Sequence, residues 1–208
     1  MALNRPFGLA ILRSGGVNVY NGQATRYRIP STDGSAFYVG DHVKQVAGAD
    51  ATGVPNVIKG TGTTFQRGVM VGVENPTVGG VSIQGTVIDS TITSVPATKT
   101  RDYYIWVVDD SQVFMMMQDD GITGGNLVAA SASLNSSTTI TAPSLGYQLS
   151  GNVLLSSSFA TNVALQLKLV GLAQFPVLAG GSANAFGAFA VWVCRWNQHE
   201  LMGNQVGV

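Results

Sequence analysis

The sequence predicts an all-β protein, either an antiparallel β-sandwich or a jelly-roll-like barrel, with long loops between its strands. Clusters of Gly, Pro, Asn, Ser and Thr recur about every 8–12 residues, the turn spacing typical of such folds. Between these clusters lie short runs of β-branched and aromatic residues, which strands favour. No long stretch repeats apolar residues at i, i+3, i+4 and i+7, so we expect little helix.

Two regions are the most informative about pairing. Residues 103–108 and 112–117, separated by a short polar turn, predict a hairpin whose arms are buried on both faces. Residues 164–170 alternate leucine with polar residues, which predicts a strand with one face in solvent. The full set of expected strands is 26–29, 37–39, 42–46, 68–73, 81–83, 103–108, 112–117, 138–141, 164–172 and 189–196.

The length of 208 residues suits one domain with a short appendage. We assign residues 25–208 to a single β-sandwich domain and residues 1–24 to an N-terminal arm or edge segment. Residues 49–64 are expected to be a loop. The Thr-rich stretch 86–100 is interpreted as a loop, with an exposed strand or extended arm as alternatives.

The chain carries unusually little charge. Charged residues make up 11% of the sequence, against about 25% in typical soluble domains, and the net charge is zero. Because charge keeps a monomer soluble, such a surface predicts that much of it is covered by partner proteins. Lys and Arg are scattered singly, which argues against nucleic-acid binding. Arg26 and Arg28, which share one strand face, are the nearest approach to a basic patch and could contact an acidic partner.

Cellular location is constrained by cysteine use and by the N-terminus. Cys194 is the only cysteine, so no disulfide can form within the chain, and a reducing compartment fits. The first residues lack the basic flank and apolar run of a signal peptide. No stretch approaches the roughly 18 apolar residues of a membrane helix. We therefore expect synthesis in a cytoplasm, with no membrane partner.

The sequence offers little for catalysis. The histidines, His42 and His199, have no nucleophile or ligand set at a recognisable spacing, and no cofactor or metal motif is present. The acidic pairs 109–110 and 119–120 are interpreted as turn residues, since neighbouring carboxylates on a strand point to opposite faces. We expect a protein that is not an enzyme.

Near the C-terminus, Trp192, Cys194 and Trp196 alternate onto one face of an expected strand. Two tryptophans and a thiol on one face indicate core as the first interpretation. An oligomer contact is the alternative, because aromatic residues are enriched at interfaces.

Short motifs spread over most of the chain carry a family resemblance. They are residues 5–9, 20–23, 26–30, 37–44, 68–73, 103–110, 112–118 and 196–200. In this order they resemble the layout of small head proteins of tailed bacteriophages, the capsid decoration or cement family. The Thr-rich stretch 86–100 is longer than that family leads us to expect.

The resemblance implies a virion structural protein on the capsid exterior that stabilises contacts between capsomers. Its partners would be the major capsid protein and further copies of itself, with a homotrimer favoured and a dimer as the alternative. Residues 4–12 are expected to contact the shell or a neighbouring subunit as an arm or edge strand. The candidate interface residues are Arg5, Phe7, Arg26, Arg28, Trp192 and Trp196.

Two other functions remain open. The first is a tail-associated β module that binds a receptor or glycan, with exposed aromatics such as Tyr103, Tyr104 or Tyr147 stacking on sugars. The second is a hydrolase, which the scarcity of His, Cys and Glu disfavours. Binding to a glycan array would distinguish the first from a cement protein.

Overall fold

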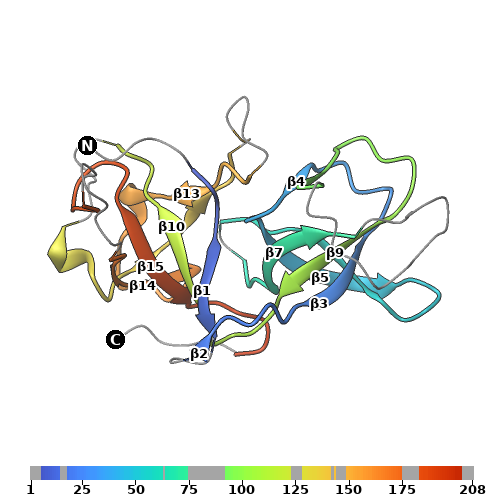
Figure 1. The fold of residues 1–208 in the computed structure, drawn as a ribbon, viewed down its shortest axis with the longest axis horizontal. Coiled ribbons are helices and arrows are strands. Elements are labelled where there is room, and N and C mark those ends of the chain that lie inside the picture. Colours follow the sequence, from blue (N-terminus) through green and yellow to red (C-terminus); the bar gives the residue numbers. More distant parts are fainter. Residues whose placement is uncertain are drawn as a thin grey trace.

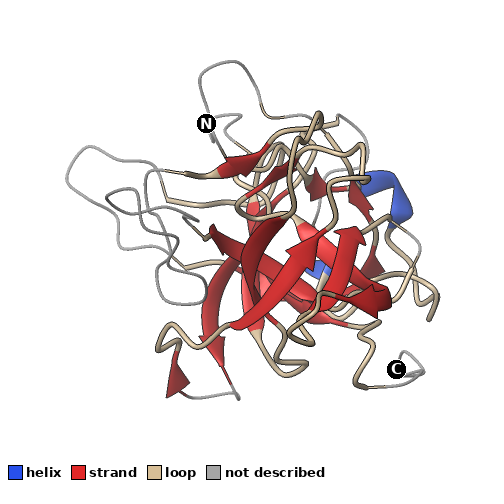
Figure 2. Cartoon of the chain, turned by 90° about the vertical axis from the view of Figure 1, so that its right-hand side faces the viewer, coloured by secondary structure: helices blue, strands red, loops and turns tan. Residues whose placement is uncertain are grey.

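The computed structural model describes residues 6–14, 18–62, 64–74, 92–122, 128–141, 143, 149–174 and 183–202. Within these ranges the chain is almost entirely strand and loop, as expected (Figure 2). The only helical elements described are the single 3-10 turns η1 (Ala129–Ser131) and η2 (Ser156–Ser158). Within the same ranges no helix is long and apolar enough to cross a membrane. The expected strand at 81–83 lies outside the described residues.

Figure 1 shows two β lobes side by side. One lobe is a closed five-stranded barrel, antiparallel apart from the parallel pair β3–β6. Alternate residues of its strands point inward, so that Tyr27, Ile29 and Ile105 are buried in the barrel core. In barrel order the strands are β3 (Thr25–Ile29), β6 (Pro55–Lys59), β5 (His42–Ala49), β7 (Gly68–Val73) and β9 (Tyr103–Val108), with the small sheet β4 (Phe37–Tyr38)–β8 (Ser94–Val95) beside them.

The other lobe is a six-stranded antiparallel sheet, accompanied by the short pair β12 (Thr138–Thr139)–β13 (Val153–Leu154). Its inner face forms a second core, to which the barrel contributes Val69 and Val108. The lobes are therefore joined by buried apolar contact. In sheet order the strands are β11 (Asn135–Ser136), β14 (Leu167–Leu172), β15 (Val191–Trp196), β10 (Phe114–Gln118), β1 (Ala10–Ser14) and β2 (Asn18–Val19).

The prediction of a hairpin between residues 103–108 and 112–117 is wrong. β9 pairs with β3 and β7 of the barrel, whereas β10 pairs with β1 and β15 of the sheet. The intervening turn carries the chain from one lobe to the other. Ile105 and Val107 of β9 lie in the barrel core, and Met115 and Met117 of β10 lie in the core of the sheet, whereas Trp106 and Met116 on the opposite faces are half-buried. The apolar residues on both faces, which the sequence pattern assigned to a buried hairpin, thus belong to two strands that each cover a different core.

The expected loop 49–64 contains a strand, and the expected N-terminal segment 1–24 contains two. Residues 55–59, inside the expected loop 49–64, form β6 and close the barrel. Within the expected N-terminal segment 1–24, residues 10–14 and 18–19 form β1 and β2, at one end of the six-stranded sheet. Leu9 is buried in the core of that sheet. Removing residues 1–12 would therefore disrupt a paired strand.

Candidate functional site

The face of the six-stranded sheet that points away from the core is apolar along its middle. Along β15, Trp192, Cys194 and Trp196 are buried inward, so Val191 and Val193 point outward and remain half-buried. Val193 lies opposite Met116 of β10. We call this surface, formed by the outward side chains of β14, β15, β10 and β1, the outer face.

Two β-bulges add apolar side chains to the strands that flank β10 and β15. Leu12 is the extra residue where the β1–β10 register shifts, and Val170 is the extra residue where the β14–β15 register shifts. Their exposed fractions are 39% and 42%. Bulges commonly re-aim a side chain, and here each leaves a branched apolar side chain in solvent.

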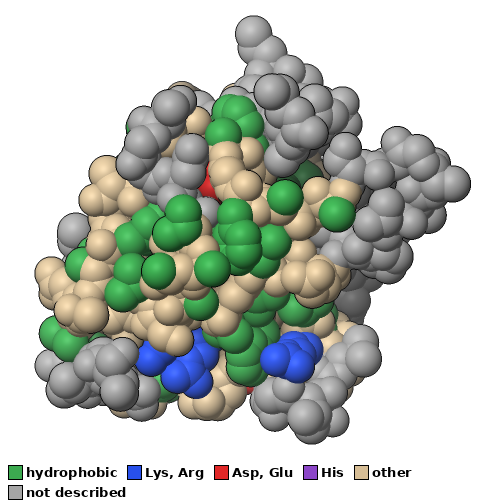
Figure 3. Space-filling view, turned by 90° about the vertical axis from the view of Figure 1, so that its left-hand side faces the viewer, with side chains coloured by type: hydrophobic (Ala, Val, Ile, Leu, Met, Phe, Trp, Pro, Cys, Tyr) green, Lys and Arg blue, Asp and Glu red, His purple; other side chains and the backbone are tan. Residues whose placement is uncertain are grey.

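Figure 3 views the molecule from the side of this lobe and shows hydrophobic side chains gathered across its middle, with Lys and Arg along the lower border. An antiparallel sheet with one face on a core usually presents a polar second face to water. The outer face departs from that rule. Contiguous exposed apolar patches on proteins typically mark interaction surfaces.

A row of cations crosses the outer face at one end of this apolar surface. Lys168 of β14 lies directly opposite Arg195 of β15, Arg195 lies opposite Phe114 of β10, and Phe114 lies opposite Arg13 of β1. The guanidinium of Arg13 stacks on the Phe114 ring, 4.2 Å from its centroid. We call Lys168, Arg195 and Arg13 the cationic row.

The structure corrects the interface assignment of Trp192 and Trp196. Their exposed fractions are 0% and 2%, and both lie in the core with Cys194. The first interpretation, core, therefore holds. Strand alternation correctly placed the three on one face, but only sheet packing decides which face is covered.

Arg26 and Arg28 share one face of β3, as their spacing predicts. That face is the outside of the barrel, and both arginines pair within the chain. Arg26 binds Glu74 through Nε and Nη2, at 2.5 and 3.0 Å. Arg28 forms a salt bridge of 2.7 Å with Asp102. Phe7 is half-buried at the start of the described chain, and Arg5 lies outside the described residues.

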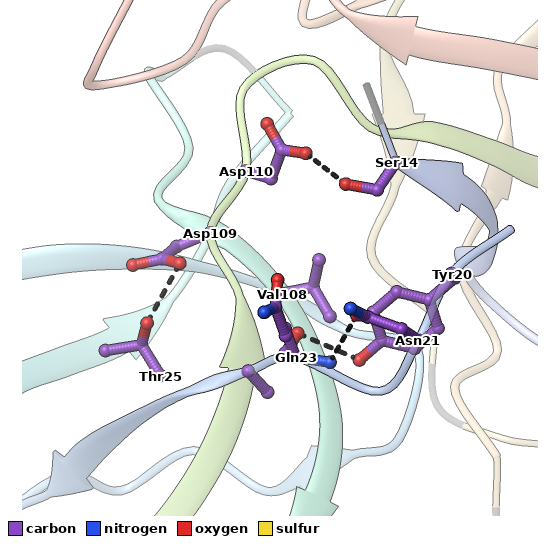
Figure 4. A pocket seen from close by; sticks show the side chains of 9 residues that line it. Ser14, Tyr20, Asn21, Gln23, Thr25, Val108, Asp109 and Asp110 are labelled. Atoms are coloured by element: carbon purple, nitrogen blue, oxygen red, sulfur yellow. Dashed lines mark hydrogen bonds between the residues drawn. The ribbon is translucent and has the colours of Figure 1, made fainter. Parts of the chain in front are cut away.

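A polar pocket of about 350 Å³ lies where the chain passes from barrel to sheet (Figure 4). Ser14 of β1 donates to Asp110 at 2.7 Å, and Thr25 of β3 donates to Asp109 at 3.0 Å. Asp109 also accepts hydrogen bonds from Tyr27 and Arg67. Residues 109–110 therefore do more than form the expected turn. Their carboxylates bind residues of both lobes and so hold the connecting turn to the barrel and to the sheet.

A buried carboxylate, that of Asp41, links the barrel to residues 150–152. The carboxylate of Asp41, fully buried, forms a salt bridge of 2.9 Å with Lys59. It also accepts hydrogen bonds from Ser150 at 2.5 Å and from Asn152 at 3.1 Å. Each oxygen is therefore bound by donors of this chain, which indicates a structural role.

The histidines and the cysteine are buried. Burial lowers the pKa of His42 to about 4, lowers the pKa of His199 below its usual range, and raises the pKa of Cys194 to about 12. The thiol of Cys194 contacts the carbonyl oxygen of Met115 at 3.7 Å. Among the residues that the structure describes, no three His, Cys, Asp or Glu side chains are grouped to hold a metal ion.

The aromatic pair considered for glycan binding lies on β9. Tyr104 borders an open depression of about 460 Å³ with Asp50, Arg28 and Asp102. Its hydroxyl donates to Asp50 at 2.7 Å, and the Arg26 guanidinium stacks on its ring at 3.9 Å. One ring face is therefore already occupied. Tyr147, the other candidate, lies outside the described residues.

Comparison with known proteins gives no relative. No protein-family model, no curated protein and no solved structure matches the chain.

Sequence reasoning missed the outer face as a site. The alternation in residues 164–170 and 192–196 already separates Lys168 and Arg195 from the apolar side chains around them. What the sequence lacked was the register that places Lys168 beside Arg195 and puts Arg13 in the same row, across Phe114.

Proposed function

We propose that this protein is a structural binding protein that uses the outer face of its six-stranded sheet to contact another protein. More specifically, we propose a decoration protein of a tailed-phage capsid, which binds the major capsid protein on the virion exterior as a homo-oligomer and has no catalytic role. The observation that carries the proposal is the apolar outer face, with Leu12 and Val170 exposed on bulges. The assignment to a capsid rests, in addition, on the sequence resemblance to head proteins.

The physical argument concerns the cost of leaving this face in water. Removing apolar surface from water contributes about 25 cal/mol for each Å², and a partner that covers Leu12, Met116, Val170 and Val193 would recover that contribution. Low charge over the whole chain points the same way. In a closed oligomer, several such faces would dock together, so modest contacts would add to a stable attachment.

The test uses purified protein and capsids assembled without it. Binding is measured by cosedimentation, and particles are imaged to locate added density. Val170→Asp should weaken binding at least about tenfold, because it places a charge in a contact that excludes water. Val163→Asp is the matched control, since Val163 is 41% exposed but lies in the turn before β14.

Failure of the wild-type protein to bind these capsids, or equal binding by both variants, would contradict the proposal. Native mass measurement of the free protein addresses the oligomer separately. We expect a trimer, with a dimer as the alternative.

The alternative function is a tail-associated module that binds a receptor or glycan. The depression beside Tyr104 supports it, whereas the Arg26 guanidinium on the Tyr104 ring weakens it, because sugar stacking needs a free aromatic face. Binding to a glycan array that Tyr104→Ala abolishes would favour this alternative.

A further inference from the structure

The cationic row contains a like-charge contact that no ion pair balances within the described ranges. Lys168 and Arg195 are directly opposed on neighbouring antiparallel strands, so both side chains project from the outer face. Cations directly opposed across a sheet repel one another and lower its stability. Neither residue takes part in an ion pair within the described part of the chain.

Arg13 extends the row on the far side of Phe114. The ring lies between Arg13 and Arg195 in the strand register and stacks with the Arg13 guanidinium. Stacking of this kind orients the planar cation. The Arg13 Nε is buried and has no hydrogen-bond partner among the described residues. The stacked ring thus holds the Arg13 guanidinium in a fixed orientation beside the outer face.

We propose that the cationic row binds carboxylates on an acidic surface of the partner protein, while the neighbouring apolar side chains form the dry part of the contact. This inference rests on the proposed function, since it names the chemistry of the partner at the same face. Arginine suits this role because its guanidinium can form paired hydrogen bonds with a carboxylate. The partner's charge would also remove the repulsion between Lys168 and Arg195.

The neighbouring residues favour an acidic protein over the other occupants. β1, β10, β14 and β15 contain no Asp or Glu, so a second copy that docked through these strands would offer the cationic row no carboxylate. Nucleic-acid binding draws on many cations, whereas this row has three and borders apolar side chains such as Met116 and Val193. A mixed apolar and cationic face matches a protein surface.

The test is Lys168→Glu, which reverses one charge and lets the new carboxylate pair with Arg195 inside the sheet. Two effects of opposite sign are expected. The melting temperature should rise by about 1–3 °C, because an attraction replaces a repulsion. Binding to capsids assembled without this protein should weaken about tenfold or more, because two cations are withdrawn from the partner. Unfolding could not produce both results.

Arg101→Glu is the matched control, because it makes the same charge change at an exposed arginine beside Tyr103 of the barrel. It should leave binding unchanged. Raising NaCl from 50 to 500 mM should weaken wild-type binding about tenfold, and Lys168→Glu should reduce this dependence. A short DNA duplex is included as a competing polyanion and should bind at least about tenfold more weakly than the capsid.

The possible results distinguish a failure of this inference from a failure of the proposed function. If the wild-type protein binds capsids but neither salt nor Lys168→Glu alters the affinity, the carboxylate partner is wrong and the proposed function stands. If the wild-type protein does not bind capsids, both are wrong. Equal losses in Lys168→Glu and Arg101→Glu, or DNA binding as tight as capsid binding, would also overturn the inference.

Discussion

His42 should make the protein lose stability in mild acid. The side chain is 1% exposed, its Nε2 lies 3.5 Å from the Thr138 hydroxyl, and its Nδ1 has no hydrogen-bond partner among the described residues. Burial lowers the pKa of His42 to about 4 from its ordinary 6.5, with Asp41 opposing and Lys59 reinforcing that direction. Folding therefore requires the neutral imidazole.

The magnitude follows from proton linkage. Because the folded pKa lies below the unfolded one, the contribution is complete above about pH 6.5 and is lost as the pH falls toward 4. A difference of about 2.5 pH units corresponds to about 3 kcal/mol when fully expressed. At pH 5.0 the loss should be about 2 kcal/mol relative to pH 7.5. His199, whose pKa burial also lowers, adds in the same direction.

The assay is urea unfolding at pH 7.5 and pH 5.0, compared between the wild type and His42→Gln. The glutamine has no titrating group, so most of the pH dependence should disappear even if the variant is less stable at both pH values. His199→Gln is the control and should keep the contribution of His42. Equal losses of stability in the wild type and His42→Gln would refute the reasoning.

Three further predictions concern other buried groups. Cys194, whose pKa burial raises to about 12, should not react with a thiol reagent at pH 8 in the folded protein but should react fully in urea; stoichiometric reaction without urea would contradict the burial. Arg26→Met should lower the melting temperature by about 6–12 °C, because it removes the guanidinium from the buried Glu74 carboxylate at a cost of about 3 kcal/mol; an unchanged melting temperature would show that the pair does not stabilise the barrel. Gly8→Ala should lower the free energy of unfolding in urea by about 2 kcal/mol or more, because Gly8 has φ +70° and a methyl group would lie 2.5 Å from two neighbouring heavy atoms. Gly22→Ala is the control: Gly22 has φ +84° but open space around it, so the loss should be about half as large.

Local sequence patterns succeeded where one strand supplies all the information. The alternation of Trp192, Cys194 and Trp196 placed them on one face, and the spacing of Arg26 and Arg28 placed both on one face of β3. The period of a strand is two residues, so the pattern is visible without knowing the neighbours. A two-residue pattern does not show which strand pairs with which, so the pairing could not be predicted from it.

Long-range pairing explains the failures. Residues 103–108 and 112–117 look like a hairpin because they are adjacent, apolar and separated by a turn. Their partners are instead distant in sequence, and the turn is held by Ser14 and Thr25 from two different sheets. Residues 55–59 were missed because they are flanked by Gly-, Thr- and Ala-rich stretches, and only closure of the barrel makes them a strand.

By itself the sequence determined that the chain folds as strands, which side chains of β14 and β15 alternate, and how little charge covers the molecule, because these properties depend on composition and on a two-residue period. The tertiary structure decided that the tryptophans face inward and that Lys168, Arg195 and Arg13 form one row. Arg13 pairs with Phe114, and Phe114 pairs with Arg195, so residues distant in the sequence are brought together by the pairing register between strands, which no local pattern encodes.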